Sequence, residues 1–419
     1  MSITSYPNLV RLTSTGNGNV VTFGGGNIDA FGRLRIASPF TLFDSQNRYA
    51  IDEQFDTSTS GSASTSHLSN ESSVQMSVTT TSGDEVIRET KRVFPYQPGK
   101  SLLVMETFVF AARQTNLRQR VGYFGANDGV YLEQNDTDIR LVVRTSTSGS
   151  ASDAAYATQA NWNVDKLDGT GPSGKTINLT TDPKAQIFFM DFEWLGVGTV
   201  RCGFVIDGEF VICHKFHHAN SVTAVYMKTA ILPLRYEITA TDTLSSGTSM
   251  KQICSSVVSE GGYQQVKALS WARMTAATTV TTSFEPMVSI RLNSSSLDAV
   301  VLPAYYTVFP IPNNVDYEIA LIKNATLTGA SYDTSTFNNV DYDVSATALT
   351  GGTIVLQNYT KGTNQSSGDA IVPTGYNFDL QVGRTIAGTS DVYTLAARTI
   401  SGTDDIIGCL AFWDLTDGA

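Results

Sequence analysis

Two carboxylates in the middle of the chain stand at a spacing that acid–base catalysis uses. Asp191 and Glu193 are two residues apart in a largely apolar run. In a β-strand such residues share a face, so both side chains would point the same way. A retaining glycoside hydrolase needs two carboxyl groups about 5 Å apart, which this arrangement can supply. Their alternation with Met190, Phe192 and Trp194 is equally typical of an ordinary amphipathic strand, and we expect no enzyme activity.

A cluster of histidines offers a second kind of chemistry, metal binding. In an extended strand His214, Phe216 and His218 share one face, and His217 lies on the other. Two imidazoles on one face can hold a metal ion, but no third ligand follows at a recognisable spacing. We therefore expect no metal and no cofactor. Calcium is the alternative, because two acidic loops offer oxygen ligands that turn chemistry explains equally well: Asn127–Gly129 and Asn135–Asp138.

Aromatic residues offer a third kind of chemistry, the stacking of sugar rings. Most large aromatic side chains lie in protein cores, so we expect core positions for most of them and keep sugar stacking as the alternative. The tryptophans concerned are Trp162, Trp194, Trp271 and Trp413.

The composition limits the classes of partner. Among 419 residues, 28 Lys and Arg stand against 39 Asp and Glu, for a net charge of −11. This balance argues against nucleic acid and against anionic membranes, which select basic surfaces. No run of about 20 apolar residues predicts a spanning helix, and the first residues do not resemble a signal peptide. We expect folding in a cytoplasm, where the four cysteines stay reduced.

The elements that position these residues read as β-strands. Only 16% of the residues are charged and 41% are hydrophobic, with abundant Ser, Thr and Gly. Such a composition indicates β-structure with many turns. Alternating or β-branched segments predict strands at Leu102–Phe110, Arg120–Gly125, Gly129–Glu133 and Asp138–Arg144. A long Gly-, Ser- and Asp-rich loop is expected over residues 145–183.

Residues 199–216 predict a β-hairpin. Asp207-Gly208 supplies the two positive φ angles of a type I′ turn. Counting outward from the turn, Phe204 faces Val211 and Cys202 faces Cys213. The two cysteines are expected to be small buried residues, and whether they pair is left open.

A short helix, ended by Gly261-Gly262, is predicted within residues 246–262, with a strand over Ile253–Val258 as the alternative. Beyond residue 284, further strands are expected at sandwich-like spacing. They are Met287–Leu292, Tyr317–Ile322, Gly352–Asn358, Asn377–Val382, Asp391–Ala397 and Ile406–Trp413.

These elements divide the chain into three parts. Residues 1–50 read as an extended N-terminal arm, residues 51–283 as a jelly roll and residues 284–419 as a C-terminal β-sandwich. The arm is too short to bury a core of its own, so it is expected to lie along another surface, either a partner chain or its own body. Docking of its apolar residues on a neighbouring subunit or particle protein is the favoured expectation. The expected anchors are Phe31, Leu34, Phe40 and Phe43.

Two sets of segments carry a family resemblance. Residues 86–240 resemble a concanavalin-A/laminin-G type jelly roll, which implies two stacked antiparallel sheets. Other segments are similar to virion structural proteins of tailed bacteriophages, which implies a component of the particle and carries over no site residue. These segments are Asp29–Tyr49, His217–Asn220, Leu232–Ile238 and Lys251–Tyr263.

The expected function is therefore structural and non-enzymatic: capsid decoration, a collar or tail component, or a fibre. The expected location is the virion, assembled in the host cytoplasm. The expected partners are other virion proteins and further copies of the chain, with a trimer favoured. An adhesin for host surface glycans is the alternative. A glycan depolymerase that uses Asp191 and Glu193 is a further one.

Overall fold

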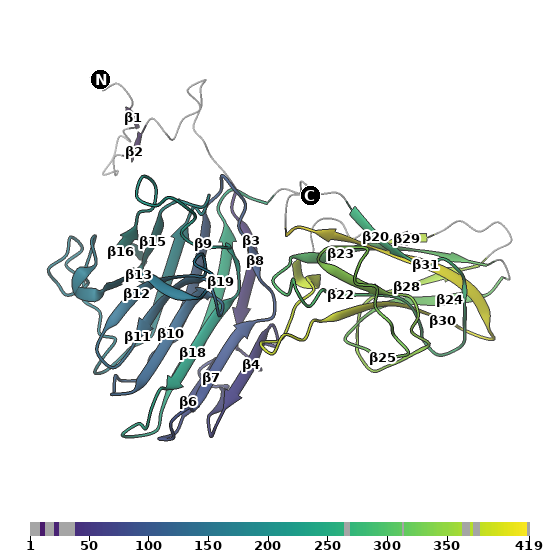
Figure 1. The fold of residues 1–419 in the computed structure, drawn as a ribbon, viewed down its shortest axis with the longest axis horizontal. Coiled ribbons are helices and arrows are strands. Elements are labelled where there is room, and N and C mark those ends of the chain that lie inside the picture. The colour runs from purple at the N-terminus through teal and green to yellow at the C-terminus, as the bar shows by residue number, and fades with distance from the viewer. Residues whose placement is uncertain are drawn as a thin grey trace.

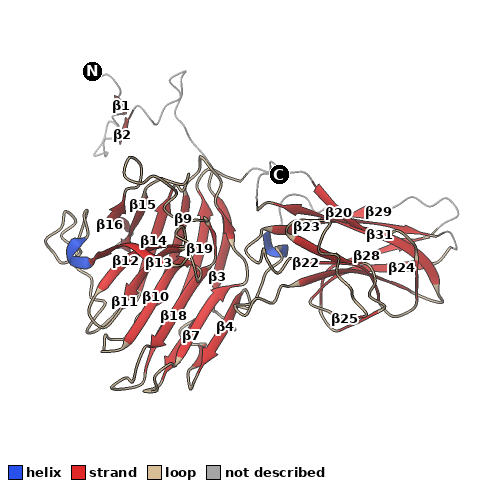
Figure 2. Cartoon of the chain, viewed as in Figure 1, coloured by secondary structure: helices blue, strands red, loops and turns tan. Residues whose placement is uncertain are grey.

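The computed structural model describes residues 9–12, 21–24, 38–263, 269–311, 314–362, 369–371 and 378–416. Within these ranges the protein is nearly all β, and the named strands pair antiparallel (Figure 2). The helical elements among them are two short 3-10 turns, η2 (Gln159–Asn161) and η3 (Phe378–Leu380). The predicted all-β, antiparallel jelly-roll and sandwich class is confirmed.

The first sheet of the N-terminal sandwich has seven strands. Their order is β13 (Ser152–Thr158), β12 (Ile139–Thr145), β11 (Gly129–Gln134), β10 (Leu117–Phe124), β18 (Leu234–Ala240), β7 (Glu85–Thr90) and β4 (Phe55–Ser60). One face of each central strand is apolar and fully buried, as the alternation of residues such as Leu117, Val121 and Tyr123 requires.

The second sheet has eight strands and packs against this apolar face. Its order is β16 (Glu209–Phe216), β15 (Val200–Ile206), β14 (Gln186–Phe192), β9 (Leu102–Val109), β19 (Thr248–Ser259), β6 (Ser73–Val78) and β5 (Ser64–Leu68), and β3 (Phe40–Gln46) also pairs with β19. A minor pair, β8 (Phe94–Pro95) with β17 (Ile231–Leu232), completes this part. β1 (Leu9–Leu12) and β2 (Val21–Gly24) form a separate two-stranded sheet.

The C-terminal sandwich also has two sheets. One contains β20 (Leu269–Arg273), β31 (Asp404–Asp414), β23 (Val301–Pro310) and β29 (Asp369–Ile371), with β21 (Thr278–Val280) beside β31. The other has the order β26 (Val340–Asp343), β22 (Glu285–Leu292), β30 (Val392–Thr399), β24 (Asp316–Lys323) and β28 (Thr353–Lys361). A small ribbon pairs β25 (Thr326–Thr328) with β27 (Ala348–Thr350). The segment 377–382, expected as a strand, instead contains η3.

The two sandwiches lie side by side and share apolar packing (Figure 1). Val300, Leu302, Phe378 and Leu415 come from the C-terminal part, yet they belong to the buried cluster of the N-terminal sandwich. Polar contacts join the same surfaces. Arg384 pairs with Glu89, and the amide of Gln381 donates to the Val93 carbonyl.

Two boundaries differ from the expected ones. Residues 40–46 form β3 of the N-terminal sandwich rather than the end of an arm, because Leu42 and Phe43 complete its core. The C-terminal sandwich includes strands from residue 269, because β20 and β21 pair with β31 near the chain end.

Residues 248–259 form a strand, so the predicted helix is wrong and the alternative is confirmed. β19 lies between β9 and β6, and its pairing in mid-sheet decides its conformation. The predicted loop 145–183 likewise contains β13, which extends the first sheet.

The hairpin at 199–216 is confirmed, with positive φ at Asp207 and Gly208 and Phe204 opposite Val211. Beyond that pair a β-bulge shifts the register, so Cys202 faces His214 rather than Cys213. Both thiols are free and buried.

Candidate functional site: an arginine-lined sheet face

The outward face of the seven-stranded sheet carries a ladder of alternating charge. Arg140 on β12 lies opposite Glu133 on β11. Glu133 lies opposite Arg120 on β10, and Arg120 lies opposite Glu237 on β18. Directly opposed residues share a face, so these four side chains form one row across four strands. We call this surface the arginine face and define it by Arg118, Arg120, Arg140, Arg144 and Arg235.

Glu237 is the centre of this face. Its carboxylate pairs with Arg118 at 2.9 Å, with Arg235 at 2.9 Å and with Arg120. Burial alone would raise the pKa of Glu237, but Arg120, Arg235 and Arg118 outweigh it and lower that pKa to about 2. Burial would likewise lower the pKa of Arg120, and its pairing with Glu237 raises that pKa overall. Glu237 is therefore ionised near neutral pH.

A second row brings aromatic rings to the same face. Tyr156 on β13 lies opposite Val142, Val142 opposite Tyr131, and Tyr131 opposite Gly122. Tyr131 is buried and donates to Asp153 at 2.8 Å. Tyr156 is 58% exposed.

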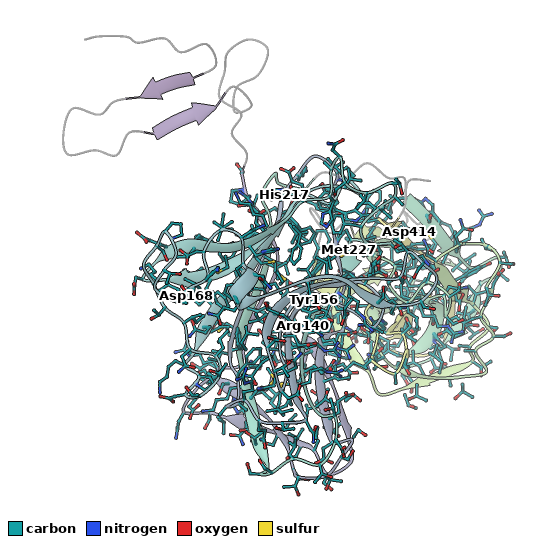
Figure 3. All side chains as sticks on the ribbon, turned by 60° about the vertical axis from the view of Figure 1, so that its left-hand side comes forward. Arg140, Tyr156, Asp168, His217, Met227 and Asp414 are labelled. Carbon is teal, nitrogen blue, oxygen red and sulfur yellow. The ribbon has the colours of Figure 1, made fainter. Side chains whose placement is uncertain are left out.

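Arginines lie over these rings. The Arg140 guanidinium lies 5.1 Å from the Tyr156 ring centroid, and Figure 3 shows the two side chains near each other. Arg120 lies 5.4 Å from the ring of Tyr131 and 5.5 Å from that of Phe124. The face thus combines one exposed ring with planar hydrogen-bond donors.

The arginine face ends at the C-terminal sandwich. Glu89 accepts from Arg235 at 3.1 Å and from Arg384 at 2.7 Å. Arg384 also lines a polar cavity of about 540 Å³ between the sandwiches. Its other lining groups include residues 125–128, Lys228 and the Ser294–Ser296 loop.

The two carboxylates considered as the alternative catalytic pair have different surroundings. Asp191 lies on β14, where Ser101 and Arg201 occupy both of its carboxylate oxygens. Glu193 lies just beyond the end of β14 and is exposed. The strand that was expected to align them ends at Phe192.

His214 and His218 make hydrogen bonds and ring contacts with neighbouring residues of the N-terminal sandwich. His218 is buried, stacks on Tyr226 with ring centroids 3.9 Å apart, and its Nδ1 lies 2.7 Å from the Gly198 carbonyl oxygen. Nδ1 of the buried His214 accepts from the Asn163 backbone at 3.2 Å. Burial lowers the pKa of both imidazoles. Within the described ranges, no group of three or more His, Cys, Asp or Glu is placed to hold a metal.

The acidic loops proposed for calcium are built as turns. Asp128 accepts from the backbone N–H groups of Ser146 and Lys228 and from the Ser146 hydroxyl. Asn135 accepts from the backbone N–H groups of Thr137 and Asp138. These contacts account for both residues without a ligand.

One motif present in the sequence was not recognised among the expected sites. Residues 169–176 match the spacing of a phosphate-binding loop, G-x-x-x-x-G-K-T. The structure gives this segment another role, because the Asp165 carboxylate accepts from Leu167 and Ser173 backbone N–H groups. Lys175 pairs with Asp207 at 2.7 Å. The next element is strand β14 rather than a helix, so the cradle of a phosphate loop does not form.

The tryptophans divide as the core interpretation expects, with one exception. Trp162 is buried, and Trp194 and Trp413 pack partly buried against the same cluster. Trp271 on β20 is exposed and meets Tyr305 edge-on at 5.0 Å.

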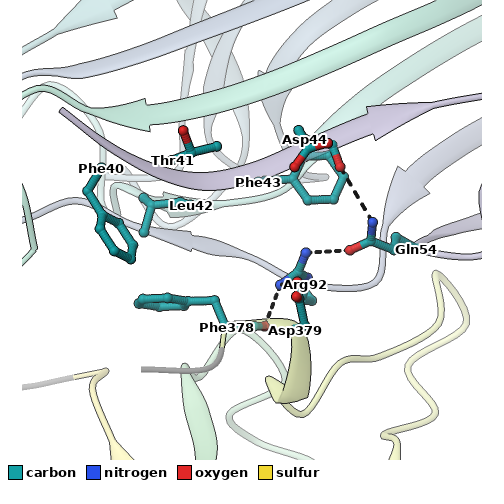
Figure 4. Close-up of a pocket in the computed structure, with 9 residues that line it drawn as sticks. All are labelled: Phe40, Thr41, Leu42, Phe43, Asp44, Gln54, Arg92, Phe378 and Asp379. Atoms are coloured by element: carbon teal, nitrogen blue, oxygen red, sulfur yellow. Dashed lines mark hydrogen bonds and ion pairs between the residues drawn. The ribbon is translucent and has the colours of Figure 1, made fainter. Parts of the chain in front are cut away.

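Two of the four predicted arm anchors belong to the chain's own sandwich. Phe43 is buried in the N-terminal core, and Phe40 packs at its edge against Phe378 at 5.9 Å. Strand pairing with β19 places Phe40 and Phe43 on the chain's own body, which is the alternative kept for this segment. Phe31 and Leu34 lie outside the described residues. Phe40, Phe43, Arg92 and Phe378 line a cavity of about 570 Å³ at the junction (Figure 4).

Comparison with known proteins gives only distant likenesses. No family model matches the chain, and no curated protein matches its sequence. A carbohydrate recognition domain of Emp47p is 9% identical with a TM-score of 0.33, over 54% of this chain and 97% of that chain. The CBM2 module of an evolved Dit from Lactobacillus casei BL23 phage J-1 is 6% identical with a TM-score of 0.37, over 55% and 100%. A β-glucanase of Bacillus licheniformis is 10% identical with a TM-score of 0.32, over 53% and 99%. Likenesses at this level carry no argument about function.

The arginine face was missed in the sequence, although a signal for it exists. Arg118 and Arg120 are two residues apart, as are Arg235 and Glu237, so each pair shares a strand face. The pairing of β10 with β18 could not be read from this pattern, because more than 100 residues separate the strands. In the described part of the chain, no helix is long and apolar enough to cross a bilayer.

Proposed function

We propose that the chain is a non-enzymatic structural component of a tailed-phage particle, in capsid decoration, collar, tail or fibre. The observation that carries this proposal is the shared core of the two sandwiches, since a rigid two-domain body suits a projecting particle protein. Segments similar to virion proteins also supply β18 and β19, the inner strands of the two sheets. In this proposal residues 1–37 attach the body to other virion proteins or to further copies of the chain.

The test is occupancy on purified particles. Full-length protein and a variant lacking residues 1–37 are supplied to particles that lack the chain, and bound copies are counted by quantitative mass spectrometry. Full occupancy is expected for the full chain and loss of most of it for the variant. Equal occupancy would contradict anchoring by residues 1–37, and absence of both from particles would contradict the structural role. Light scattering of both proteins gives the oligomeric state.

A second candidate function is glycan binding by the arginine face, the adhesin alternative. The exposed Tyr156 ring beside Arg140 favours it, because an aromatic face flanked by planar donors suits a sugar ring. The full-length protein on a glycan array is the first measurement. Tyr156→Ala should abolish binding, and Tyr359→Ala should not, because Tyr359 is equally exposed (61%) but lies on β28 of the C-terminal sandwich. Binding lost only with Tyr359→Ala would move the site to the other domain.

Absence of hydrolysis is part of the proposal. The engagement of Asp191 by Arg201 and the position of Glu193 outside β14 support it. Polysaccharide cleavage by the wild type that Glu193→Gln abolishes would establish the depolymerase alternative instead.

A further inference from the structure

The ion pairs of the arginine face have a common orientation. The side chains of Glu237, Glu133 and Glu89 are 1%, 2% and 4% exposed. Those of Arg118, Arg144 and Arg140 are 31%, 23% and 22% exposed. Asp153 is the exception among the carboxylates, at 27%. In the pairs of Glu237, Glu133 and Glu89 the carboxylate therefore lies beneath and the guanidinium above, so each of these pairs is a dipole with its positive end toward solvent.

The exposed guanidinium groups of this face can only donate hydrogen bonds. A guanidinium carries five N–H donors and accepts nothing, and it matches carboxylate and phosphate oxygens in two-point geometry. Nε of Arg118 is buried and has no hydrogen-bond partner. Arg118 and Arg144 flank the row that contains Arg120 and Arg140, so donors lie along both sides of it.

We propose that the arginine face binds an acidic glycan, one that carries carboxylate or phosphate groups along a hydroxyl-rich chain. This inference rests on the glycan-binding function proposed above and names its ligand class. The acidic groups meet the guanidinium layer, and one sugar ring stacks on Tyr156 at the sheet edge. The chain's net charge of −11 does not oppose this locally, since salt screens charges beyond about 8 Å.

The spacing of the arginines favours a glycan over a nucleic acid. Arg140 and Arg120 lie on β12 and β10 with β11 between them, which places them about 10 Å apart. Duplex DNA carries one charge per about 1.7 Å of its axis, a far closer spacing than that of these arginines. A polysaccharide with one acidic group per one or two sugars has the more widely spaced charges that the face can match.

The test compares one polymer in charged and neutral form. Binding of the full-length protein to polygalacturonate, to its methyl ester and to poly(glycerol phosphate) is measured by interferometry at several salt concentrations. We expect affinity for polygalacturonate to exceed that for its methyl ester at least about tenfold and to fall with added salt, and poly(glycerol phosphate), which has no sugar ring, to bind more weakly than polygalacturonate. Arg118→Gln combined with Arg144→Gln should reduce it about tenfold or more.

These substitutions leave no buried carboxylate without a partner. Glu237 keeps Arg120 and Arg235, and Asp153 keeps Tyr131 and Arg140. The matched control is Lys251→Gln with Lys361→Gln, which removes the same charge at positions off the face and should change affinity less than about twofold. A melting curve for each variant verifies folding.

The outcomes are distinct. Equal affinity for the polyacid and its methyl ester would overturn the acidic ligand and leave glycan binding standing. Absence of binding to every polyanion would also overturn it, and a blank array of neutral glycans would then remove the glycan-binding function as well. Duplex DNA bound as tightly as the acidic polymers would replace the glycan with a nucleic acid.

Discussion

At the scale of single residues, the most unusual group is the carboxyl of Glu106. It lies on β9 and faces the core of the N-terminal sandwich, where neither of its oxygens has a hydrogen-bond partner. Burial raises its pKa well above the ordinary value. The folded protein therefore keeps Glu106 neutral to a higher pH than the unfolded chain, which ionises it above roughly pH 4.

We predict that Glu106→Gln stabilises the protein at pH 8 and changes little at pH 4. Because the folded pKa is raised, stability is lost as pH rises from the unfolded pKa through the folded one, by roughly 1–2 kcal/mol per pH unit. The neutral amide removes this loss. Urea unfolding at both pH values measures it, with the exposed Glu53→Gln as control. A variant less stable than wild type at pH 8 would refute the prediction.

Glu237 gives the opposite pH dependence. Its folded pKa is lowered to about 2, so its contribution is present above an unfolded pKa of roughly 4 and is lost as pH falls from there toward 2. A shift of this size corresponds to roughly 3 kcal/mol. Glu237→Gln should therefore destabilise the protein at pH 7 by about that amount and flatten the acid limb of its stability curve. Acid titration of unfolding free energy measures both, and an unchanged acid limb would contradict the assignment.

The residue-level reading of the sequence succeeded where chemistry is local. Asp207-Gly208 specifies its turn by its own backbone preferences, independently of the rest of the sheet. Cys202 shows the limit, because a bulge two residues before Phe204 changes its partner. At Gly203 in that bulge, a Cβ would come within 2.1 Å of the Val211 carbonyl oxygen, a contact that only the folded sheet defines.

At the scale of elements, β3 tests where the N-terminal arm ends. Leu42 and Phe43 are buried in the core, and each contributes roughly 1.5–3 kcal/mol by burial. We predict that deletion of residues 1–37 leaves the melting temperature nearly unchanged, whereas deletion of residues 1–50 lowers it by about 5 °C or more. Calorimetry of the two truncations side by side decides the matter, and equal melting temperatures would show that β3 is dispensable.

A comparison of β9 and β12 with β3 and β19 explains which strands the sequence predicts. Strands with their own alternation, such as β9 and β12, are predicted from sequence because their pattern repeats the burial pattern. β3 is not predicted, and β19 is predicted only as the alternative to a helix. The conformation of each depends on the other and on β9, and about 200 residues separate β3 from β19 in the chain. Contacts of that separation leave no periodic signal in either segment.

At the scale of the whole molecule, the sandwiches are joined by a buried arginine. Arg92 belongs to the N-terminal sandwich, and its guanidinium donates to the Phe378 carbonyl and to Gln54. It also lies 3.4 Å from Asp379 and is largely buried (Figure 4). Phe378 packs against Phe40 in the same junction. Neither sandwich buries these groups alone, so we expect the two to unfold together.

We predict that Arg92→Met combined with Phe378→Ala separates their unfolding. The double variant removes the charged donor and the shared ring, so the two sandwiches lose their main coupling at this junction, and one calorimetric transition should become two. Arg113→Met is the control, because Arg113 is exposed and bonds within the N-terminal sandwich, to the Thr137 carbonyl. A single transition in the double variant would mean that the remaining contacts couple the domains, namely the packing of Val300, Leu302 and Leu415 and the Arg384–Glu89 pair. Two transitions already present in the wild type would contradict the rigid body on which the proposed particle role depends.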